Sequence, residues 1–104
     1  MALRQLSVQE RAEARRKALQ ARRARAELKA AFAAGEVGLA EVFARADAED
    51  AVARLRTVDL LLALPGVGEV RARETMAGCG ISPRRRLGGL GRRQREALIA
   101  YIGR

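Results

Sequence analysis

The stretch Leu64-Pro65-Gly66-Val67-Gly68-Glu69-Val70-Arg71-Ala72 places a proline and a Gly-x-Gly motif between two segments with the composition of helices. A proline disfavours helical backbone at the residue before it, so the upstream helix should stop at Pro65. Glycines tolerate positive φ, which a tight reversal of the chain can require. The stretch therefore predicts a hairpin in which two helices are joined by a short turn.

Upstream of this hairpin, the sequence predicts three short helices. The nearest runs from Thr57, whose hydroxyl can cap it, through the apolar residues 60–64. Before it we expect a helix over residues 39–46 and another that starts within residues 47–50 and reaches Leu55. The run of three leucines at 60–62 should lie in the core.

Downstream of the hairpin, the sequence predicts two more helices joined by a basic loop. The first starts at residue 68 or 69 and ends at Gly78, since glycine favours helix ends. The second covers residues 92–102 and should turn three side chains inward: Leu98, Tyr101 and Ile102. Cys79, the single cysteine, is expected to be a small buried apolar residue.

Residues 8–34 have the composition of one long helix. Ser7-Val8-Gln9-Glu10 fits a capping box, and no glycine or proline follows before Gly35. About 27 residues at 1.5 Å each form a rod of roughly 40 Å. Its large apolar residues, Leu28 and Phe32, lie near the C-terminal end. We therefore expect the second half to pack on a core and the first half to project, or to fray when no ligand is bound.

No stretch of the chain alternates apolar and polar residues as a strand does. The predicted fold is therefore all-α, with a long N-terminal helix on a small bundle of short helices. The 104 residues are expected to form a single domain, 1–104. Within it, residues 8–34 form the long basic helix, residues 35–56 the first short helices and residues 57–104 the hairpin module.

The charge of the chain points to a polyanionic partner. It contains 21 basic and 12 acidic residues, for a net charge of +9. The segments 1–34 and 55–104 each carry +6, whereas residues 35–54 carry −3. A surplus of this size on a small body favours nucleic acid first and an anionic membrane surface second.

The composition also argues against several kinds of site. The chain has no histidine, which is the commonest general base and metal ligand. One cysteine allows neither an internal disulfide nor a zinc cluster. No apolar run approaches the length of a spanning helix, and no signal segment is present. We therefore expect a cytoplasmic protein without cofactor, metal or membrane partner.

The long helix carries a one-sided row of cations. At 100° per residue, five of them fall within a sector of about 80° that contains no acid. An ordinary solvated face is the alternative, but such faces usually interleave acids with bases. A membrane-surface helix is less well supported because the rod has few large apolar residues. Duplex DNA carries one negative charge per about 1.7 Å, which suits such a row. This second basic surface comprises Arg11, Arg15, Arg22, Arg25 and Lys29.

The hairpin and the basic loop can each bind phosphate. Exposed N–H groups of the turn and of the following helix N-terminus can hold a phosphate oxygen, although a plain helix corner is the alternative. The segment Ser82-Pro83-Arg84-Arg85-Arg86-Leu87-Gly88-Gly89-Leu90-Gly91-Arg92-Arg93-Gln94-Arg95 contains six arginines. Guanidinium groups bind phosphates bidentately. Two leucines can anchor this segment to the core, and the alternative is a flexible Gly/Arg linker.

The order of these features is similar to a known module. The hairpin Pro65–Gly68, a helix, Gly80-Ile81-Ser82-Pro83, a basic loop and a final helix resemble the helix–two-turns–helix module. That module occurs in a small-subunit ribosomal protein and in formamidopyrimidine-DNA glycosylases. The whole chain resembles the actinobacterial (mycobacterial and streptomycete) integration host factors. The likeness covers Met1-Ala2-Leu3 and residues 21–29, 64–72 and 85–94.

This resemblance implies a non-enzymatic, nucleoid-associated protein that binds duplex DNA with little sequence preference. It implies bending or compaction of DNA and assistance to site-specific recombination. It places the DNA contacts on the hairpin, residues 65–71, and on the covering loop, residues 82–94. Relatives often carry lysine in the hairpin, where this chain has Gly66 and Glu69, and a basic residue can stand at Gly88.

Two other functions remain open at this point. An RNA-binding protein of a ribosomal-type nucleoprotein could use the same module. A DNA-repair enzyme on this module would need a catalytic N-terminal amine, typically on proline, and often a zinc finger, whereas position 2 is Ala. The favoured prediction is a monomer that binds duplex DNA, with two basic regions that could bend one duplex or contact two DNA segments.

Overall fold

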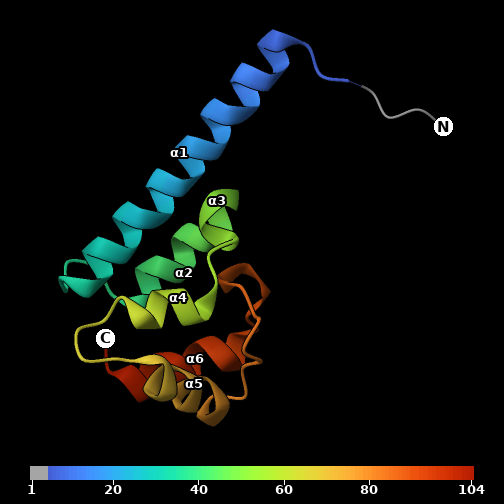
Figure 1. Ribbon diagram of the computed structural model, residues 1–104. Helices are drawn as coiled ribbons and strands as arrows, with labels where there is room; N and C mark the ends of the chain where they lie inside the picture. The colour runs from blue at the N-terminus through green and yellow to red at the C-terminus, as the bar shows by residue number, and fades with distance from the viewer. Residues whose placement is uncertain (1–4) are drawn as a thin grey trace.

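The computed structural model describes residues 5–104, and the regular structure within that range is helical (Figure 1). The only β-pairing among these residues is an isolated antiparallel bridge between Arg56 and Arg86. The all-α prediction is therefore confirmed. The first stretch of the resemblance to the integration host factors, residues 1–3, lies outside the described residues.

Seven helical elements are found among residues 5–104. They are α1 (Val8–Ala33), α2 (Leu39–Ala48), α3 (Asp50–Ala53), α4 (Thr57–Leu62), α5 (Glu69–Gly78), the 3-10 turn η1 (Leu87–Gly89) and α6 (Arg92–Ile102).

Helix α1 begins at the capping box that the sequence predicts. The Glu10 N–H donates to Ser7 Oγ at 3.1 Å, and the Ser7 N–H donates to the Glu10 carboxylate at 3.2 Å. The helix ends at Ala33, and Gly35 follows with a φ of +77°. A capping interaction of this kind is decided by residues close in sequence, so the start of the helix follows from the sequence alone.

The two halves of α1 differ as expected. Leu28 and Phe32 are fully buried, whereas every residue from 11 to 20 is exposed. Figure 1 shows the first half of α1 extending past the other helices as a rod. The prediction that the second half packs on the core and the first half projects is confirmed.

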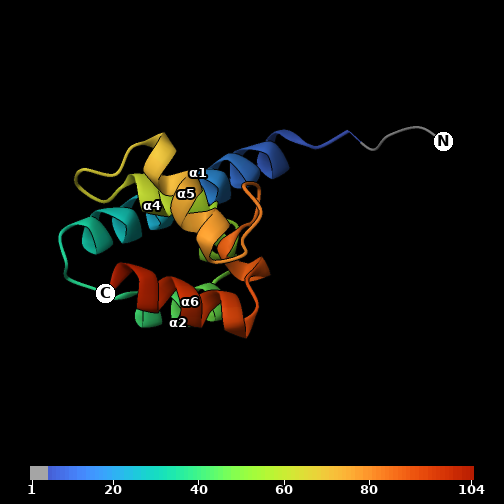
Figure 2. The ribbon, with the colours of Figure 1, turned by 90° about the horizontal axis from the view of Figure 1, so that it is seen from below.

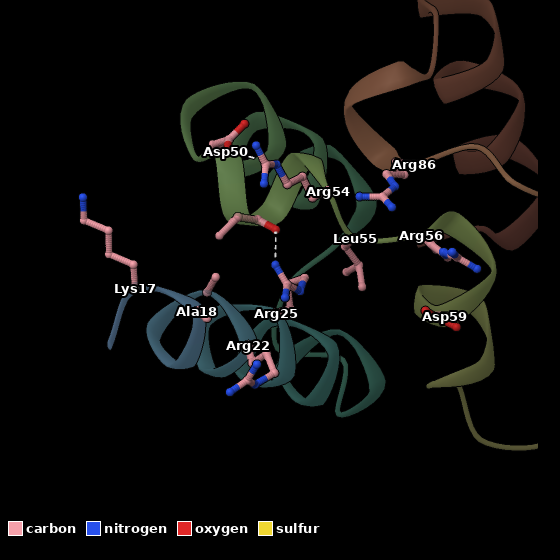
Figure 3. A pocket seen from close by; sticks show the side chains of 12 residues that line it. Lys17, Ala18, Arg22, Arg25, Asp50, Arg54, Leu55, Arg56, Asp59 and Arg86 are labelled. Atoms are coloured by element: carbon pink, nitrogen blue, oxygen red, sulfur yellow. Dashed lines mark hydrogen bonds and ion pairs between the residues drawn. The ribbon is translucent and has the colours of Figure 1, made fainter. Parts of the chain in front are cut away.

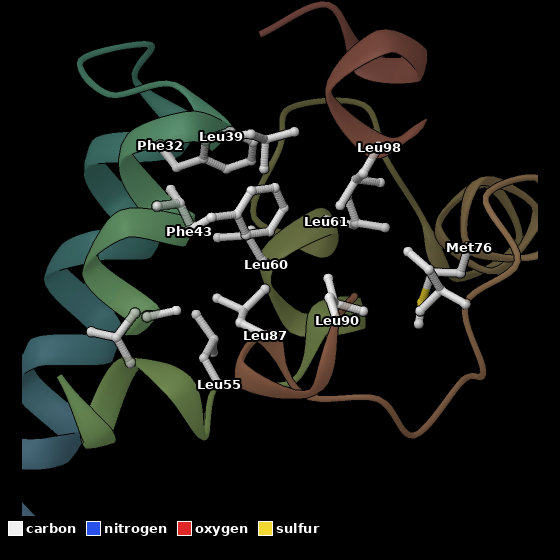
Figure 4. Packing of buried hydrophobic residues seen from close by; sticks show 14 of the residues in the cluster. Phe32, Leu39, Phe43, Leu55, Leu60, Leu61, Met76, Leu87, Leu90 and Leu98 are labelled. Atoms are coloured by element: carbon white, nitrogen blue, oxygen red, sulfur yellow. The ribbon is translucent and has the colours of Figure 1, made fainter. Parts of the chain in front are cut away.

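The core joins α1 to all the shorter elements (Figure 4). Leu39 and Phe43 of α2 and Leu60 of α4 pack near Phe32, and Leu98 of α6 lies beside Leu61. The basic loop contributes two buried leucines, Leu87 and Leu90, at 0% and 5% exposure. These leucines hold the loop on the body of the protein, as predicted.

Two expectations about side chains are wrong. Thr57 does not cap α4: the N-cap position is Arg56, and the Thr57 hydroxyl is buried without a hydrogen-bond partner among residues 5–104. Tyr101 does not face inward, since 62% of it is exposed. A Cβ at Gly78 would come within 3.6 Å of the Tyr101 ring. The ring therefore lies against α5 at Gly78, where it stays largely exposed.

Cys79 is buried, as the sequence predicts, and burial raises the pKa of its thiol. Within residues 5–104, no helix is both long and apolar enough to cross a membrane.

Candidate nucleic-acid interface

The hairpin presents its backbone to solvent. The Val67 N–H donates to the Leu64 carbonyl at 3.2 Å, and Gly66 sits at the corner with a φ of +78°, a conformation that favours glycine. Gly68 is the N-cap of α5 and provides no side-chain hydrogen bond. The first N–H groups of α5 therefore lack a side-chain cap, which is the arrangement that can bind an anion. Of residues 65–71, only Val67 is half-buried and the others are exposed.

The basic loop is fixed along its first half by the backbone. The Thr57 N–H donates to the Arg85 carbonyl at 3.0 Å, and the Leu87 N–H donates to the Leu55 carbonyl at 2.9 Å. These two bonds attach the loop to the first residue of α4 and to the segment between α3 and α4. With both leucines buried as well, the loop is an anchored segment, and the flexible-linker alternative is wrong.

Gly88 lies where no side chain fits. A Cβ at this position would come within 2.8 Å of the Ala53 Cβ and 3.2 Å of the Ala53 carbonyl oxygen. A larger residue would push the loop away from α3. The glycine that stands here in place of a basic residue is therefore explained by close packing of the loop on α3.

Five arginines of the loop and of the first turn of α6 are exposed. Within the described residues only one of them, Arg92, has a carboxylate partner: Glu96, at 3.0 Å in an exposed pair. Arg85 makes one long contact, 3.4 Å, to the Gly89 carbonyl. The four without a carboxylate are Arg84, Arg85, Arg86 and Arg93.

Gln94, which belongs to the predicted loop interface, has a structural role in the free protein. Its Oε1 accepts a hydrogen bond from the Gly91 N–H at 2.9 Å. Its Nε2 donates to the Gly80 carbonyl at 2.8 Å. Gln94 thus links the start of α6 to the turn after α5. Its amide oxygen and its amide nitrogen are both hydrogen-bonded within the protein.

Arg95, the sixth arginine of the basic segment, is bound internally. Its two terminal nitrogens donate to the two carboxylate oxygens of Asp47, each at 2.8 Å, and its Nε donates to the Leu90 carbonyl at 3.1 Å. The guanidinium also lies 5.2 Å from the centre of the Phe43 ring. The Arg95 hydrogen bonds lower the pKa of Asp47. This arginine therefore holds α6 against α2 rather than facing solvent.

The hairpin and the loop do not meet. Figure 2 shows the yellow hairpin on one side of α5 and the orange loop on the other. A ligand that contacts both must therefore extend across α5, as a nucleic-acid backbone can.

The five residues of the second basic surface on α1 differ in how far they are exposed to solvent. Arg11, Arg15 and Arg22 are exposed, whereas Arg25 and Lys29 are half-buried. The Arg25 Nη1 donates to the Ala51 carbonyl of α3 at 3.2 Å. The three residues nearer the N-terminus are therefore exposed to a ligand, and the Arg25 hydrogen bond joins α1 to α3.

A cleft of about 660 Å³ lies where the two basic regions approach each other (Figure 3). Arg22 and Arg25 of α1 line it, and so does Arg86 of the loop. Arg54 and Arg56, which lie between α3 and α4, and Lys17 of α1 are the other basic residues that line it. Arg54 and Arg56 are absent from the interface predicted above, because nothing in their spacing indicates that the fold brings them beside α1 and the loop.

Comparison with known proteins agrees with this architecture. A family model described as an S13-like H2TH domain matches residues 32–102. The integration host factor of Mycobacterium tuberculosis is 47% identical over 103 residues, which cover 99% of this chain and 98% of that protein. The integration host factor of Mycolicibacterium smegmatis is 48% identical over 99 residues, which cover 95% and 94%.

A solved structure, described as sIHF bound to an 8bp palindromic DNA, is similar in fold. It aligns with a TM-score of 0.80 at 40% sequence identity and covers 85% of this chain and 99% of its own. With relatives this similar over nearly their whole length, the chain belongs to the actinobacterial integration host factor family, and its residues 32–102 form an S13-like H2TH domain.

Proposed function

We propose that the protein is a non-enzymatic architectural protein of the nucleoid that binds duplex DNA in the cytoplasm through phosphate contacts. It bends or compacts DNA and assists site-specific recombination. The observation that carries this proposal is the group of four exposed loop arginines without a carboxylate partner among residues 5–104, held on an anchored loop. The DNA-bound structure of a family member at 40% identity supports the same partner.

The hairpin and the loop have complementary tasks in this proposal. The uncapped N–H groups at the start of α5 bind one phosphate, and the loop arginines bind others across α5. Phosphate contacts position a protein on a duplex but carry no sequence information. The chain has no asparagine, and the Gln94 amide is engaged by Gly80 and Gly91. The interface therefore has few groups that could recognise a base edge, which favours low sequence preference.

The exposed arginines of α1 form the second basic surface of the proposed complex. Because the first half of α1 extends past the body, a duplex lying along it would be separate from one lying across α5. A single monomer could thus contact two DNA segments, or hold two parts of one bent duplex.

Binding should be steeply salt-dependent and nearly independent of sequence. If about five phosphates are neutralised, log K should fall against log[salt] with a slope of roughly −4 to −5. The measurement is a salt series of titrations with several unrelated duplexes of equal length and one structured RNA. A shallow slope, or strong preference for one duplex, would contradict the proposal, and preference for the RNA would favour the ribosomal-type alternative.

Asp47→Asn should weaken DNA binding about threefold to tenfold, although it removes a negative charge. A long-range charge effect alone would strengthen binding. Asparagine keeps only one acceptor oxygen, so the bidentate bond to Arg95 is lost and α6 is held less firmly against α2. Arg92 and Arg93, in the first turn of α6, then lose part of their alignment with the phosphates.

The control is Glu36→Gln, which makes the same charge change at an exposed turn. It should leave the affinity for DNA unchanged or slightly higher.

The pKa of Asp47 is depressed in the folded protein. The stabilising effect of its ion pair with Arg95 is therefore complete above the ordinary carboxyl pKa of about 3.9 and is lost as the pH falls through the lowered value. Titrations at neutral pH therefore compare fully ionised wild type with the variant. If both variants bind DNA more tightly than wild type by the same factor, Asp47 acts only through its charge.

A further inference from the structure

The cleft between α1, α3 and α4 concentrates cations from several elements around one opening. Its lining contains six basic and two acidic side chains, a formal charge of +4. In the described part of the chain, only one of the six is paired with a carboxylate: Arg54, whose Nε lies 3.1 Å from Asp50 in an exposed pair. The basic side chains are Lys17, Arg22, Arg25, Arg54, Arg56 and Arg86, and the acidic ones are Asp50 and Asp59.

The shape of this cleft suits a compact ligand. Its volume of about 660 Å³ lies within the roughly 300–1,000 Å³ that is usual for small-molecule sites. Figure 3 shows the Arg25 side chain reaching between α1 and α3 to the Ala51 carbonyl, while Arg56 and Arg86 lie on the far side. The same view shows Arg54 above Arg25, and Lys17 and Arg22 pointing away from this opening. Arginines from three separate segments, Arg25, Arg54 and Arg86, can thus contact one short anion, whereas a duplex offers its phosphates along the outside of a wide cylinder.

We propose that this cleft binds a polyphosphate chain, carried by a nucleoside triphosphate or by inorganic polyphosphate. A chain of three phosphates carries about three to four negative charges near neutral pH, given a second phosphate pKa near 6, which matches the charge of the lining. Arginine guanidiniums bind adjacent phosphate oxygens bidentately. The carboxylates of Asp50 and Asp59 would repel a long polyanion at the rim, but they can accept hydrogen bonds from hydroxyl or amino groups of a nucleoside.

A bound polyphosphate would regulate DNA binding, and this consequence rests on the proposed function. Arg22 and Arg25 belong to the second basic surface, and Arg86 belongs to the basic loop. Occupation of these side chains by a small anion removes them from the duplex. Polyphosphate should therefore lower the affinity for DNA more than an equal ionic strength of sodium chloride does.

The test is calorimetric titration of the full chain at about 0.15 M salt, with tripolyphosphate, ATP, GTP and inorganic phosphate as separate ligands. We expect one tripolyphosphate per chain, bound at least about tenfold more tightly than phosphate. Equal affinities for ATP, GTP and tripolyphosphate would identify the polyphosphate chain itself as the ligand. Tighter binding of a nucleotide would identify the nucleotide. Both results support the proposal.

A double substitution, Arg54→Gln with Arg56→Gln, should weaken tripolyphosphate at least about tenfold. Both side chains are exposed, so the fold should persist, which circular dichroism can check. The matched control, Arg11→Gln with Arg15→Gln, removes the same charge from the projecting half of α1 and should change tripolyphosphate binding less than about twofold. Duplex titrations of the same proteins, without polyphosphate, separate this inference from the proposed function.

Three results would overturn the inference. The first is that tripolyphosphate binds no more tightly than phosphate. The second is that both double variants weaken tripolyphosphate binding equally, which would indicate a diffuse electrostatic attraction to the whole basic surface. The Arg54/Arg56 variant could also lose duplex affinity while tripolyphosphate binding stays unchanged, which would make the cleft part of the DNA surface. If wild type binds tripolyphosphate but no duplex, the proposed function fails and the cleft assignment stands.

Discussion

Replacing Arg85, Arg86 and Arg93 together by Ala lowers the affinity for duplex DNA about a hundredfold at about 0.15 M salt. All three side chains are exposed and lack a carboxylate partner among residues 5–104. Each phosphate contact releases about 0.9 counterion, so three lost contacts at this salt correspond to roughly two orders of magnitude. The salt slope should become shallower by about 3 units.

The same triple variant should keep its fold. Two of the three side chains make no hydrogen bond within the described chain, and the third, Arg85, makes only the long contact to Gly89. Removing cations that repel one another does not destabilise a protein with a net charge of +9. Fluorescence titration over a salt series and thermal melting by circular dichroism check both parts.

The control for the triple variant is Arg16→Ala with Arg23→Ala, on the side of α1 away from the second basic surface. It should lower duplex affinity less than about threefold, because these side chains contribute only to the long-range field. If the control weakens binding as much per charge as the triple variant, the loop makes no specific phosphate contacts. A collapsed melting temperature in the triple variant would show instead that these arginines are structural.

Leu87→Ala lowers the free energy of unfolding by about 2–5 kcal/mol, the range for a buried leucine whose loss leaves a cavity. Leu87 is fully buried and lies in the core beside Leu55 and Leu60. For a chain of this length, such a loss corresponds to a fall in Tm of at least about 10 °C. Urea unfolding measures the free energy directly.

Leu19→Ala provides the comparison, since Leu19 lies on the projecting half of α1 and is 42% exposed. It should change the free energy of unfolding by no more than about 0.5 kcal/mol. A similar small effect at Leu87 would mean that the loop is not anchored by its leucines. Because Leu87 directly follows Arg86, the Leu87→Ala protein should also bind DNA less tightly wherever it remains folded.

The features that could be predicted from the sequence depend on residues close together in the chain. The capping box at Ser7 and Glu10 involves atoms three residues apart. That α4 does not continue past Pro65, and the positive φ of Gly66, follow from local sterics, although α4 already ends at Leu62. The burial of Leu28 and Phe32 follows from their shared face on one helix. The all-α fold and the long helix are therefore predictable from local patterns of residues, whereas the anchoring of the loop also depends on hydrogen bonds to Leu55 and Thr57, which lie far from it in the sequence.

The tasks of individual charged side chains are not predictable in this way. Arg95 looks like a sixth loop cation, but its partner Asp47 is 48 residues away in the sequence. Gln94 looks like a nucleic-acid contact, and its amide instead bonds to Gly80, 14 residues before it. Local patterns indicate that a guanidinium or an amide is present, but not which distant group will satisfy it.

The sequence by itself determined the number and order of the helices, the capped start of α1 and that the surface is strongly basic. Only the tertiary structure decided which cations remain available, because packing α6 against α2 pairs Arg95 with Asp47 and packing α1 against α3 engages Arg25. It also brought Arg54 and Arg56 beside Arg22 and Arg86 in one cleft. The physical reason is that backbone preference acts over a few residues, whereas ion pairs and clefts depend on where separate elements meet.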